Sequence, residues 1–375
     1  MFKDECKESK ETKFPYHPSK ILITGGCGFI ASNVLCKLVM KYPEVKFVNV
    51  DKLDYCASLK NLKELEVDGY EKIEYVDNYK FYLADITDFH AIDKIFEKEL
   101  PDTVMHFAAH THVDNSFGNS FHFTQNNIYG THVLLEVAKK YNIKRFIHVS
   151  TDEVYGEFDE ASASENSILN PTNPYSASKA GAEFIARSYY KSFNLPLIIT
   201  RGNNVYGPKQ YPEKLIPKFI TLLNKGLPCP IHGKGLEKRS FIYVDDVVNA
   251  FDVILHYGKI GEIYNIGTNE EISNIDVAKK LLELYGFGED KLYYVENRCF
   301  NDLRYTLNTS KLNNLGWKVN VDFDEGLKRT IEWYDNVLSE DAKHPYKLNE
   351  KHDGAKHWEN IDEAIVPHPR LNGSF

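Results

Sequence analysis

Short apolar runs recur along the first part of the chain, and each is rich in β-branched or aromatic residues. They are Ile21–Thr24, Val45–Asp51, Lys80–Ile86, Thr103–Ala109, Arg145–Thr151 and Leu195–Arg201. Runs that are apolar almost throughout are typical of strands buried on both faces of a parallel sheet. Between these runs, apolar residues recur at helical spacing, as at Ile30, Val34 and Leu38. This alternation predicts βαβ units and an α/β fold with a doubly wound parallel sheet.

The pattern becomes less regular after Arg201, where prolines and glycines are frequent. Strands are predicted at Phe241–Val244 and Glu262–Gly267, and helices at Ile275–Tyr285 and Glu325–Val337. We therefore expect two domains between polar tails. The expected divisions are a tail over 1–19, a sheet domain over 20–202 to which the chain returns at about 241–266, a smaller irregular domain over 203–240 and 267–340, and a tail over 341–375.

Composition and charge exclude several classes of protein. The chain has 375 residues and a net charge of −9, so we expect no basic face for nucleic acid. No apolar stretch approaches the ~20 residues of a membrane span, and the charged start lacks the apolar core of a secretory signal. The six cysteines form no C-x-x-C pair, which predicts reduced thiols in a cytoplasmic protein. The histidines near the C-terminus have no zinc-like spacing, so no metal site is expected.

A glycine-rich turn follows the first predicted strand and precedes a helix. Gly25 and Gly28 would let the backbone approach a pyrophosphate, and the helix N-terminus would supply N–H donors. Asp51 ends the next strand, where a carboxylate binds ribose hydroxyls and repels the 2′-phosphate of NADP. The pattern therefore favours NAD, and the alternative is a tight turn with a helix-packing glycine. Asp85–Ile86 and Ala108–Ala109 end the third and fourth strands at the same edge.

Tyr175 and Lys179 lie one turn apart on a predicted helix that begins after Pro174. A tyrosine is a poor base at neutral pH, and a nearby cation lowers its pKa. The spacing alone is not specific, because Tyr16/Lys20 and Tyr42/Lys46 share it. The position at a helix start, downstream of the glycine-rich turn, is what indicates a functional pair.

Thr151, Asp152 and Glu153 follow the apolar strand residues Phe146–Val149. Doubly wound sheets bind ligands at the carboxyl ends of their strands, so two adjacent acids and a hydroxyl there favour a catalytic role. The alternative is that Thr151 or Asp152 only caps a short helix.

These motifs resemble the extended short-chain dehydrogenase/reductase superfamily. The turn Thr24–Ala31 and the Tyr175/Lys179 pair carry the resemblance, which covers about residues 20–335. Ser150–Gly156 (STDEVYG) is similar to the nucleoside-diphosphate-glucose 4,6-dehydratase branch, because related 4-epimerases lack the two acids.

Longer blocks resemble two groups within this branch. Val113–Phe121, Asn127–Glu136 and Thr200–Gly207 are similar to the dehydratase domain of plant UDP-rhamnose synthases. Asp51–Leu62 is similar to animal dTDP-glucose 4,6-dehydratases. Asn301 stands where bacterial dTDP-glucose enzymes usually carry His, so UDP-glucose is the expected substrate and dTDP-glucose the alternative.

The resemblance implies a Rossmann-type fold with a smaller substrate domain and a redox-neutral elimination that uses NAD transiently. Tyr175 would take the proton of the glucose C4 hydroxyl, assisted by Lys179, while Thr151 would hold the C4 oxygen. Glu153 would remove the C5 proton and Asp152 would protonate the departing C6 hydroxyl. Adjacent carboxyl groups can hold opposite protonation states when their environments differ.

The resemblance also implies binding residues. Those for NAD are Gly25, Gly28, Phe29, Ile30, Asp51, Lys52, Asp85, Ile86, Ala108, Ala109, Asn126, Tyr175, Lys179 and Val205. Those for the nucleotide sugar are Thr111, Asn204, Lys214, Leu215, Pro230, His232, Arg239, Asn274, Asp302, Arg304 and Tyr305. Arg239 could bind a diphosphate bidentately, and the alternative is a surface arginine.

Two other functions stay open: a different sugar-nucleotide enzyme of this fold, such as a 4-epimerase or decarboxylase, and an inactive NAD-binding protein. The acids Asp152 and Glu153 argue against the first, and the intact Thr151, Tyr175 and Lys179 argue against the second. The resemblance further implies a homodimer, in which the helices after Phe121 and after Tyr175 pair as a four-helix bundle.

Overall fold

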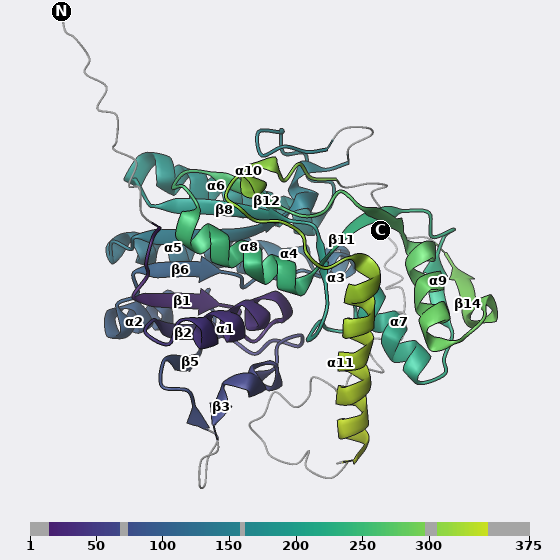
Figure 1. Cartoon of the computed structure of the whole chain (residues 1–375). Helices are drawn as coiled ribbons and strands as arrows, with labels where there is room; N and C mark the ends of the chain where they lie inside the picture. Colours follow the sequence, from purple (N-terminus) through teal and green to yellow (C-terminus); the bar gives the residue numbers. More distant parts are fainter. Residues whose placement is uncertain (1–14, 68–73, 158–161, 297–305, 344–375) are drawn as a thin grey trace, which may run out of the picture.

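A seven-stranded parallel sheet forms the centre of the protein (Figure 1). The computed structural model describes residues 15–67, 74–157, 162–296 and 306–343. Along the sheet the order is β5–β2–β1–β6–β7–β8–β12, which reverses between β1 and β6 as in doubly wound folds. The strands are β1 (Lys20–Thr24), β2 (Lys46–Asp51), β5 (Tyr79–Leu83), β6 (Thr103–His106), β7 (Arg145–Thr151), β8 (Leu197–Gly202) and β12 (Ile263–Ile266). The predicted α/β fold is confirmed.

Helices cover both faces of this sheet (Figure 1). The helices on one face are α1 (Phe29–Lys41) and α8 (Val244–Tyr257), and those on the other are α2 (Phe89–Glu99), α5 (Gly130–Lys140) and α6 (Pro174–Phe193). Successive strand residues enter opposite cores: Ile21 and Ile23 pack with the first layer and Leu22 with the second. Burial on both faces explains why the strands are apolar almost throughout.

The strand register brings the chemically interesting residues to one edge. Thr24 pairs with His106 of β6, and Asp51 pairs with Leu83 of β5. Thr151 ends β7 beside β8. Because all seven strands run in the same direction, the segments that follow them open onto the same edge.

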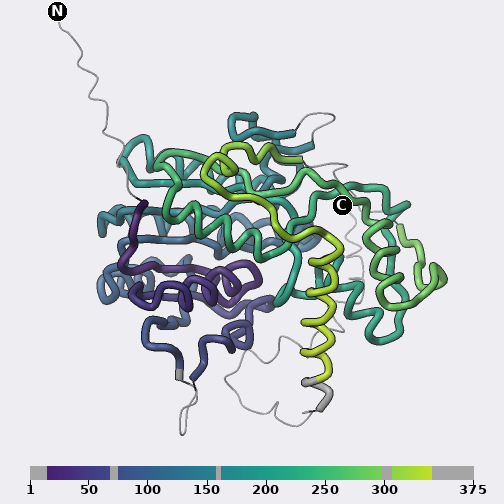
Figure 2. The backbone as a smooth tube through the Cα atoms, viewed as in Figure 1, coloured from purple at the N-terminus to yellow at the C-terminus, as the bar shows by residue number. Residues whose placement is uncertain are grey.

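A smaller group of elements lies beside the sheet (Figure 1). It comprises a three-stranded sheet of β9 (Asn204–Tyr206), β11 (Lys238–Tyr243) and β13 (Glu271–Ser273), a parallel pair of β10 (Cys229–His232) and β14 (Leu292–Val295), and the helices α7 (Leu215–Asn224), α9 (Asn274–Tyr285) and α11 (Phe323–Lys343). Figure 2 shows the chain returning to the main sheet as α8 and β12 between two passages through this group.

The remaining elements are short. They are η1 (Leu59–Leu65), β3 (Glu66–Val67), β4 (Glu74–Tyr75), α3 (Val113–Gly118), α4 (Ser120–Phe123), η2 (Thr124–Tyr129), η3 (Asp152–Tyr155), η4 (Glu289–Lys291) and α10 (Ser310–Asn313). Of these, η2 is a stretch of π-helix.

Several elements differ from the expected ones. The predicted strands Lys80–Ile86 and Thr103–Ala109 end earlier, at Leu83 and His106, because their last residues leave the ladder to line a cavity. The predicted strand Phe241–Val244 belongs to β11, which pairs with β9 and β13 and not with the main sheet. Helices α7 and α8 occupy stretches for which the apolar pattern indicated no helix.

Candidate active site

The glycine-rich turn has the geometry of an anion-binding loop. Gly25 has φ +73°, and a Cβ there would lie 2.7 Å from the Cα of Ala108. Gly28 caps α1 without a side-chain hydrogen bond, and the first turn of α1 carries no acidic residue. The first N–H groups of α1 are thus left for an anion at the positive end of the helix dipole. These residues fit a dinucleotide pyrophosphate.

Asp51 fixes this turn to the neighbouring strand. Its Oδ2 accepts a hydrogen bond from the Cys27 N–H at 2.9 Å, and its Oδ1 accepts one from the Leu53 N–H at 2.7 Å. Burial raises the pKa of Asp51. The carboxyl group lies at the end of β2, beside the turn, where the sequence placed a ribose ligand.

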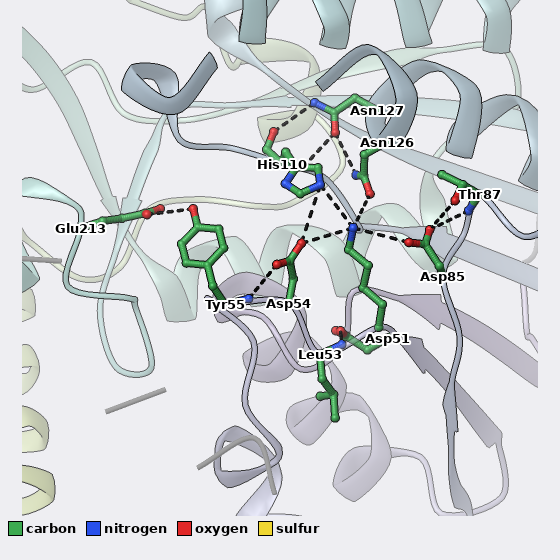
Figure 3. A network of polar contacts seen from close by, with 11 residues as sticks. Asp51, Leu53, Asp54, Tyr55, Asp85, Thr87, His110, Asn126, Asn127 and Glu213 are labelled. Carbon is green, nitrogen blue, oxygen red and sulfur yellow. Dashed lines mark hydrogen bonds and ion pairs between the residues drawn. The ribbon is translucent and has the colours of Figure 1, made fainter. Parts of the chain in front are cut away.

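The ammonium group of Lys52 contacts four polar side chains at the carboxyl edge of the main sheet (Figure 3). Its Nζ lies 3.1 Å from Asn126 Oδ1, 3.2 Å from Asp54 Oδ2, 3.3 Å from His110 Nε2 and 3.6 Å from Asp85 Oδ2. Asp85 and Asn126 were predicted as cofactor ligands, whereas Asp54 and His110 were not. The ammonium group balances the charges of two carboxylates that would otherwise repel one another and a dinucleotide.

One cavity joins most of the predicted cofactor residues. Its predicted lining residues are Gly25, Gly28, Phe29, Ile30, Asp51, Lys52, Ile86, Ala108, Ala109, Asn126, Tyr175 and Lys179. Asp85 and Val205 do not line the cavity. Asp85 forms an ion pair with the lining residue Lys52, and Val205 lies in β9. The predicted substrate residues Thr111 and Lys214 also line the cavity, and the Lys214 ammonium donates to the Thr111 carbonyl at 2.9 Å.

Tyr175 and Lys179 lie in the first turns of α6, whose start is strongly specified. Asn173 and Ser176 form a reciprocal capping box, and Pro174 is the first helical residue. Burial raises the pKa of Tyr175, and the negative charge of Glu153 acts in the same direction. Burial lowers the pKa of Lys179 to about 8.

The ammonium group of Lys179 is bound to the main sheet. It donates to the carbonyl oxygen of Val149, in β7, at 2.7 Å. This contact anchors α6 to the strand that carries Thr151. The side chain of Thr151 opposes the rise in the Tyr175 pKa through a hydrogen bond.

Thr151, Asp152 and Glu153 mark the change from β7 to the short helix η3. Thr151 caps η3, because its Oγ1 accepts from the Glu153 N–H at 3.3 Å. The same hydroxyl donates to Asp152 Oδ1 at 3.1 Å. Thr151 therefore both caps η3 and contacts the acid Asp152.

The two acids occupy unlike surroundings. Asp152 is 3 % exposed, and burial raises its pKa to about 7. The amide of Asn203 donates to its Oδ2 at 2.8 Å. Glu153 is less buried, and the amide of Asn173 donates to its Oε2 at 3.1 Å. At neutral pH, Asp152 therefore retains a proton in about half of the molecules.

Among the polar residues that contact the predicted site side chains, sequence reasoning missed Asn173, Asn203, Asp54 and His110. Asn173 could have been found, because an asparagine before Pro174 and three residues before Ser176 is a helix-start signal. Asn203 had no local signal, since it reaches Asp152 only through the pairing of β7 with β8.

The remaining predicted substrate residues lie on the smaller group of elements. They are Asn204 in β9, Leu215 in α7, Pro230 and His232 in β10, Arg239 in β11 and Asn274 in α9. Strand β11 carries Arg239 next to the strand of Asn204, because Phe241 pairs with Asn204. Asp302, Arg304, Tyr305 and Asn301 lie outside the described residues.

Within residues 15–67, 74–157, 162–296 and 306–343, no helix is both long and apolar enough to cross a membrane. No group of three or more His, Cys, Asp or Glu in that part of the chain is arranged to hold a metal ion.

The profile of the GDP-mannose 4,6 dehydratase family matches residues 22–330. The chain belongs to this family. A trifunctional UDP-glucose 4,6-dehydratase/UDP-4-keto-6-deoxy-D-glucose 3,5-epimerase/UDP-4-keto-L-rhamnose-reductase of Arabidopsis thaliana is 51 % identical over 95 % of the chain and 51 % of its own length. The chain thus spans about half the length of such plant family members.

Other family members match over nearly their whole length. The dTDP-D-glucose 4,6-dehydratase of Homo sapiens is 46 % identical over 93 % of the chain and 95 % of its own length. The crystal structure of DesIV, a dTDP-glucose 4,6-dehydratase from Streptomyces venezuelae with NAD and TYD bound, has a TM-score of 0.80 and 37 % identity. It covers 85 % of this chain and 98 % of its own. The resemblance found in the sequence is confirmed.

Proposed function

We propose that the protein is an NAD-dependent nucleoside-diphosphate-glucose 4,6-dehydratase that converts UDP-glucose to UDP-4-keto-6-deoxyglucose and water. The observation that carries this proposal is the pair of adjacent acids beside Tyr175. Burial gives Asp152 a pKa of about 7, while Glu153 is less buried and accepts a hydrogen bond from Asn173. A dehydration needs a base that removes a proton from one carbon and an acid that protonates the hydroxyl leaving the neighbouring carbon. Asp152 and Glu153 supply these two groups.

Four side chains would have separate roles in the dehydration. Tyr175 takes the proton of the C4 hydroxyl, and the Thr151 hydroxyl holds the C4 oxygen. NAD, when bound, would supply the hydride acceptor, and its positive charge near Tyr175 would oppose the rise in the Tyr175 pKa that burial causes. Glu153 removes the C5 proton, and Asp152 donates a proton to the C6 hydroxyl as it leaves as water. Return of the hydride to C6 and of a proton to C5 would then complete the 4-keto-6-deoxy sugar and leave the cofactor oxidised.

The cofactor proposal rests on the turn and the cavity. Gly25 and Gly28 leave room for the pyrophosphate at the start of α1, and Asp51 takes the ribose. NAD is present in crystal structures of relatives such as DesIV.

We assign the nucleotide and sugar contacts to the smaller group of elements, residues 203–240 and 267–340. Arg239 is the proposed diphosphate ligand, since a planar guanidinium matches two phosphate oxygens. Its positive charge lowers the pKa of Asp152, which supports this assignment. Thr111 and Asn204 would face the sugar and the diphosphate. Lys214 and Leu215 would help to hold the diphosphate and the base.

UDP-glucose is proposed over dTDP-glucose. The sequence blocks shared with plant enzymes and the higher identity to the Arabidopsis protein support this choice. The deciding experiment incubates the purified protein with each nucleotide sugar and measures kcat/KM for formation of the 4-keto-6-deoxy product. A clear preference for dTDP-glucose would reverse the assignment, and no dehydration of either would remove the proposal.

A homodimer is proposed from an exposed apolar surface on the helices after Phe121 and after Tyr175. Phe121 is 85 % exposed and Phe184 is 57 % exposed, with Phe117 and Tyr129 nearby in sequence. Such exposure of large apolar side chains is typical of an interface. Phe184→Glu should shift the sedimentation of the protein from a dimer to a 43.2 kDa species, and a wild-type monomer would contradict the proposal.

A cytoplasmic location is proposed from the thiols. Cys27, Cys36, Cys56 and Cys229 are free cysteines, which is typical of a reducing compartment.

A further inference from the structure

Residues 208–214 (PKQYPEK), here called the strap, run from β9 to α7 along the cofactor cavity. Gln210, Tyr211, Glu213 and Lys214 line that cavity together with the turn of α1 and the ends of the sheet strands. The cavity is therefore enclosed by two parts of the chain that are distant in sequence, and a bound dinucleotide would lie between them.

The first half of the strap is firmly anchored. Asn33, in α1, donates to the Pro208 carbonyl at 3.1 Å. The buried Tyr334 of α11 donates to the Gln210 carbonyl. Lys209 is buried and has φ +72°, a strained conformation for a residue with a side chain. Such a conformation persists only where the surroundings fix it.

The second half is held by contacts nearer the surface. The Tyr55 hydroxyl donates to Glu213 Oε2 at 2.9 Å (Figure 3), and the rings of Tyr55 and Tyr211 meet edge to face at 5.5 Å. Lys214 donates to the Thr111 carbonyl. Both Thr111 and Lys214 are proposed substrate ligands, whereas the Tyr55–Glu213 bond involves no proposed ligand.

The loop that presents Tyr55 is itself rigidly held. The Tyr55 N–H donates to Asp54 Oδ1 at 2.8 Å. Asp54 Oδ2 lies 3.2 Å from Lys52 Nζ and 3.7 Å from His110 Nε2 (Figure 3). When the strap moves away from the sheet, Tyr55 would therefore stay in place and the Tyr55–Glu213 bond would break.

We propose that the Tyr55–Glu213 hydrogen bond is a latch that closes the strap over the dinucleotide and sets how slowly it is released. This inference rests on the proposed use of NAD. A cofactor that receives and returns a hydride within one turnover has no need to leave between turnovers. Residues that slow its release therefore keep the enzyme loaded, without contacting the reacting atoms.

The test measures release of labelled NAD from preloaded protein into an excess of unlabelled NAD. Tyr55→Phe keeps the ring and its contact with Tyr211 but removes the donor, and Glu213→Ala removes the acceptor. Each should release NAD about 10-fold faster, because a hydrogen bond to a charged group is lost. The double variant should be no faster than either single variant, because the two changes remove the same bond.

The matched control is Tyr257→Phe, which removes a hydroxyl from an exposed tyrosine at the end of α8. It should release NAD at the wild-type rate. Hydrogen exchange of the backbone amides of Tyr211, residue 213 and Lys214 in the loaded protein is the second measurement, and it should be faster in Tyr55→Phe and Glu213→Ala.

These measurements distinguish failure of the latch proposal from failure of the proposed NAD-dependent function. Wild-type protein that holds no NAD would remove the proposed function and the latch with it. Wild-type protein that holds NAD, with wild-type release and exchange in both latch variants, would remove the latch alone. Equal acceleration by Tyr257→Phe would show a general loosening and would also reject the latch.

Discussion

Asn203 donates a hydrogen bond of 2.8 Å to Asp152, although the two residues are 51 positions apart in the sequence. The other end of the same amide accepts from the Thr268 N–H at 3.1 Å, so the NH₂ group must face the carboxyl. A Cβ on Gly267 would lie 1.9 Å from the Asn203 oxygen, which shows how closely this amide is enclosed. The protonation of Asp152 is thus controlled by burial and by a donor of fixed orientation.

The pH dependence of turnover should report this contact. Asp152 must hold a proton to act as an acid, so kcat should fall as pH rises through the pKa of about 7. The Asn203 hydrogen bond stabilises the charged form and so lowers that pKa. Asn203→Ala should therefore move the alkaline limb of the kcat–pH profile to higher pH.

The control for this profile is Asn313→Ala, at an exposed position of α10, which should leave the limb in place. A shift to lower pH in Asn203→Ala would show that the amide stabilises the protonated acid instead.

Tyr175 and Glu153 should act in different steps. Tyr175→Phe removes the base for the C4 hydroxyl, so no NADH absorbance should appear when substrate is added. Glu153→Gln still allows oxidation at C4 but cannot accept the C5 proton. Enzyme-bound NADH should then accumulate, while product forms roughly 10²–10⁴-fold more slowly. Stopped-flow absorbance with product analysis measures both quantities. The proposed roles are wrong if Glu153→Gln suppresses NADH as completely as Tyr175→Phe does.

Gly25 should be required for the dinucleotide. Gly25→Ala would place a methyl group 2.7 Å from the Ala108 backbone in addition to forcing a residue with a side chain to φ +73°. Gly286→Ala provides a matched control, because Gly286 has φ +71° and open space around it. The control should lose only about 1–2 kcal/mol of stability from its backbone conformation.

Calorimetric titration with NAD distinguishes the two variants. Gly25→Ala should lose NAD binding and show the larger drop in Tm, whereas Gly286→Ala should bind as wild type does. Normal NAD affinity in Gly25→Ala would mean that the turn does not contact the dinucleotide.

The ion pair of Glu183 and Arg201 should dominate the electrostatic contribution to stability. The two side chains are 0 % and 1 % exposed, and Arg201 donates to both carboxylate oxygens. Glu183→Gln leaves a buried guanidinium without its counter-charge and should cost ~3–5 kcal/mol in the free energy of unfolding. Glu325→Gln, which breaks the exposed pair with Arg329, should cost far less, because solvent screens that pair.

Denaturant titration of both variants measures these free energies. A double replacement, Glu183→Leu with Arg201→Met, should recover part of the loss because neither charge is then buried. Equal costs for Glu183→Gln and Glu325→Gln would contradict the prediction.

The sequence by itself determined the large sheet and the glycine-rich turn. Continuous apolar runs, turn glycines and the Asn173–Pro174 helix start are local signals, and each reflects backbone geometry or burial within a few residues. The dehydratase family could likewise be recognised from STDEVYG and the Tyr175/Lys179 pair. The predicted strand ends were wrong at Ala84 and Ala108, which lie beyond the strands, because a cavity wall is as apolar as a sheet core.

Tertiary structure alone decided which side chains meet at the site. Asn203 reaches Asp152 because β7 and β8 are neighbours, and Tyr55 reaches Glu213 because the strap crosses from β9 to α7. The pKa of Asp152 is equally a tertiary property, since burial by distant segments is its main cause. Contacts and desolvation depend on how far apart groups lie in space, and the chain order constrains that distance only between near neighbours in sequence.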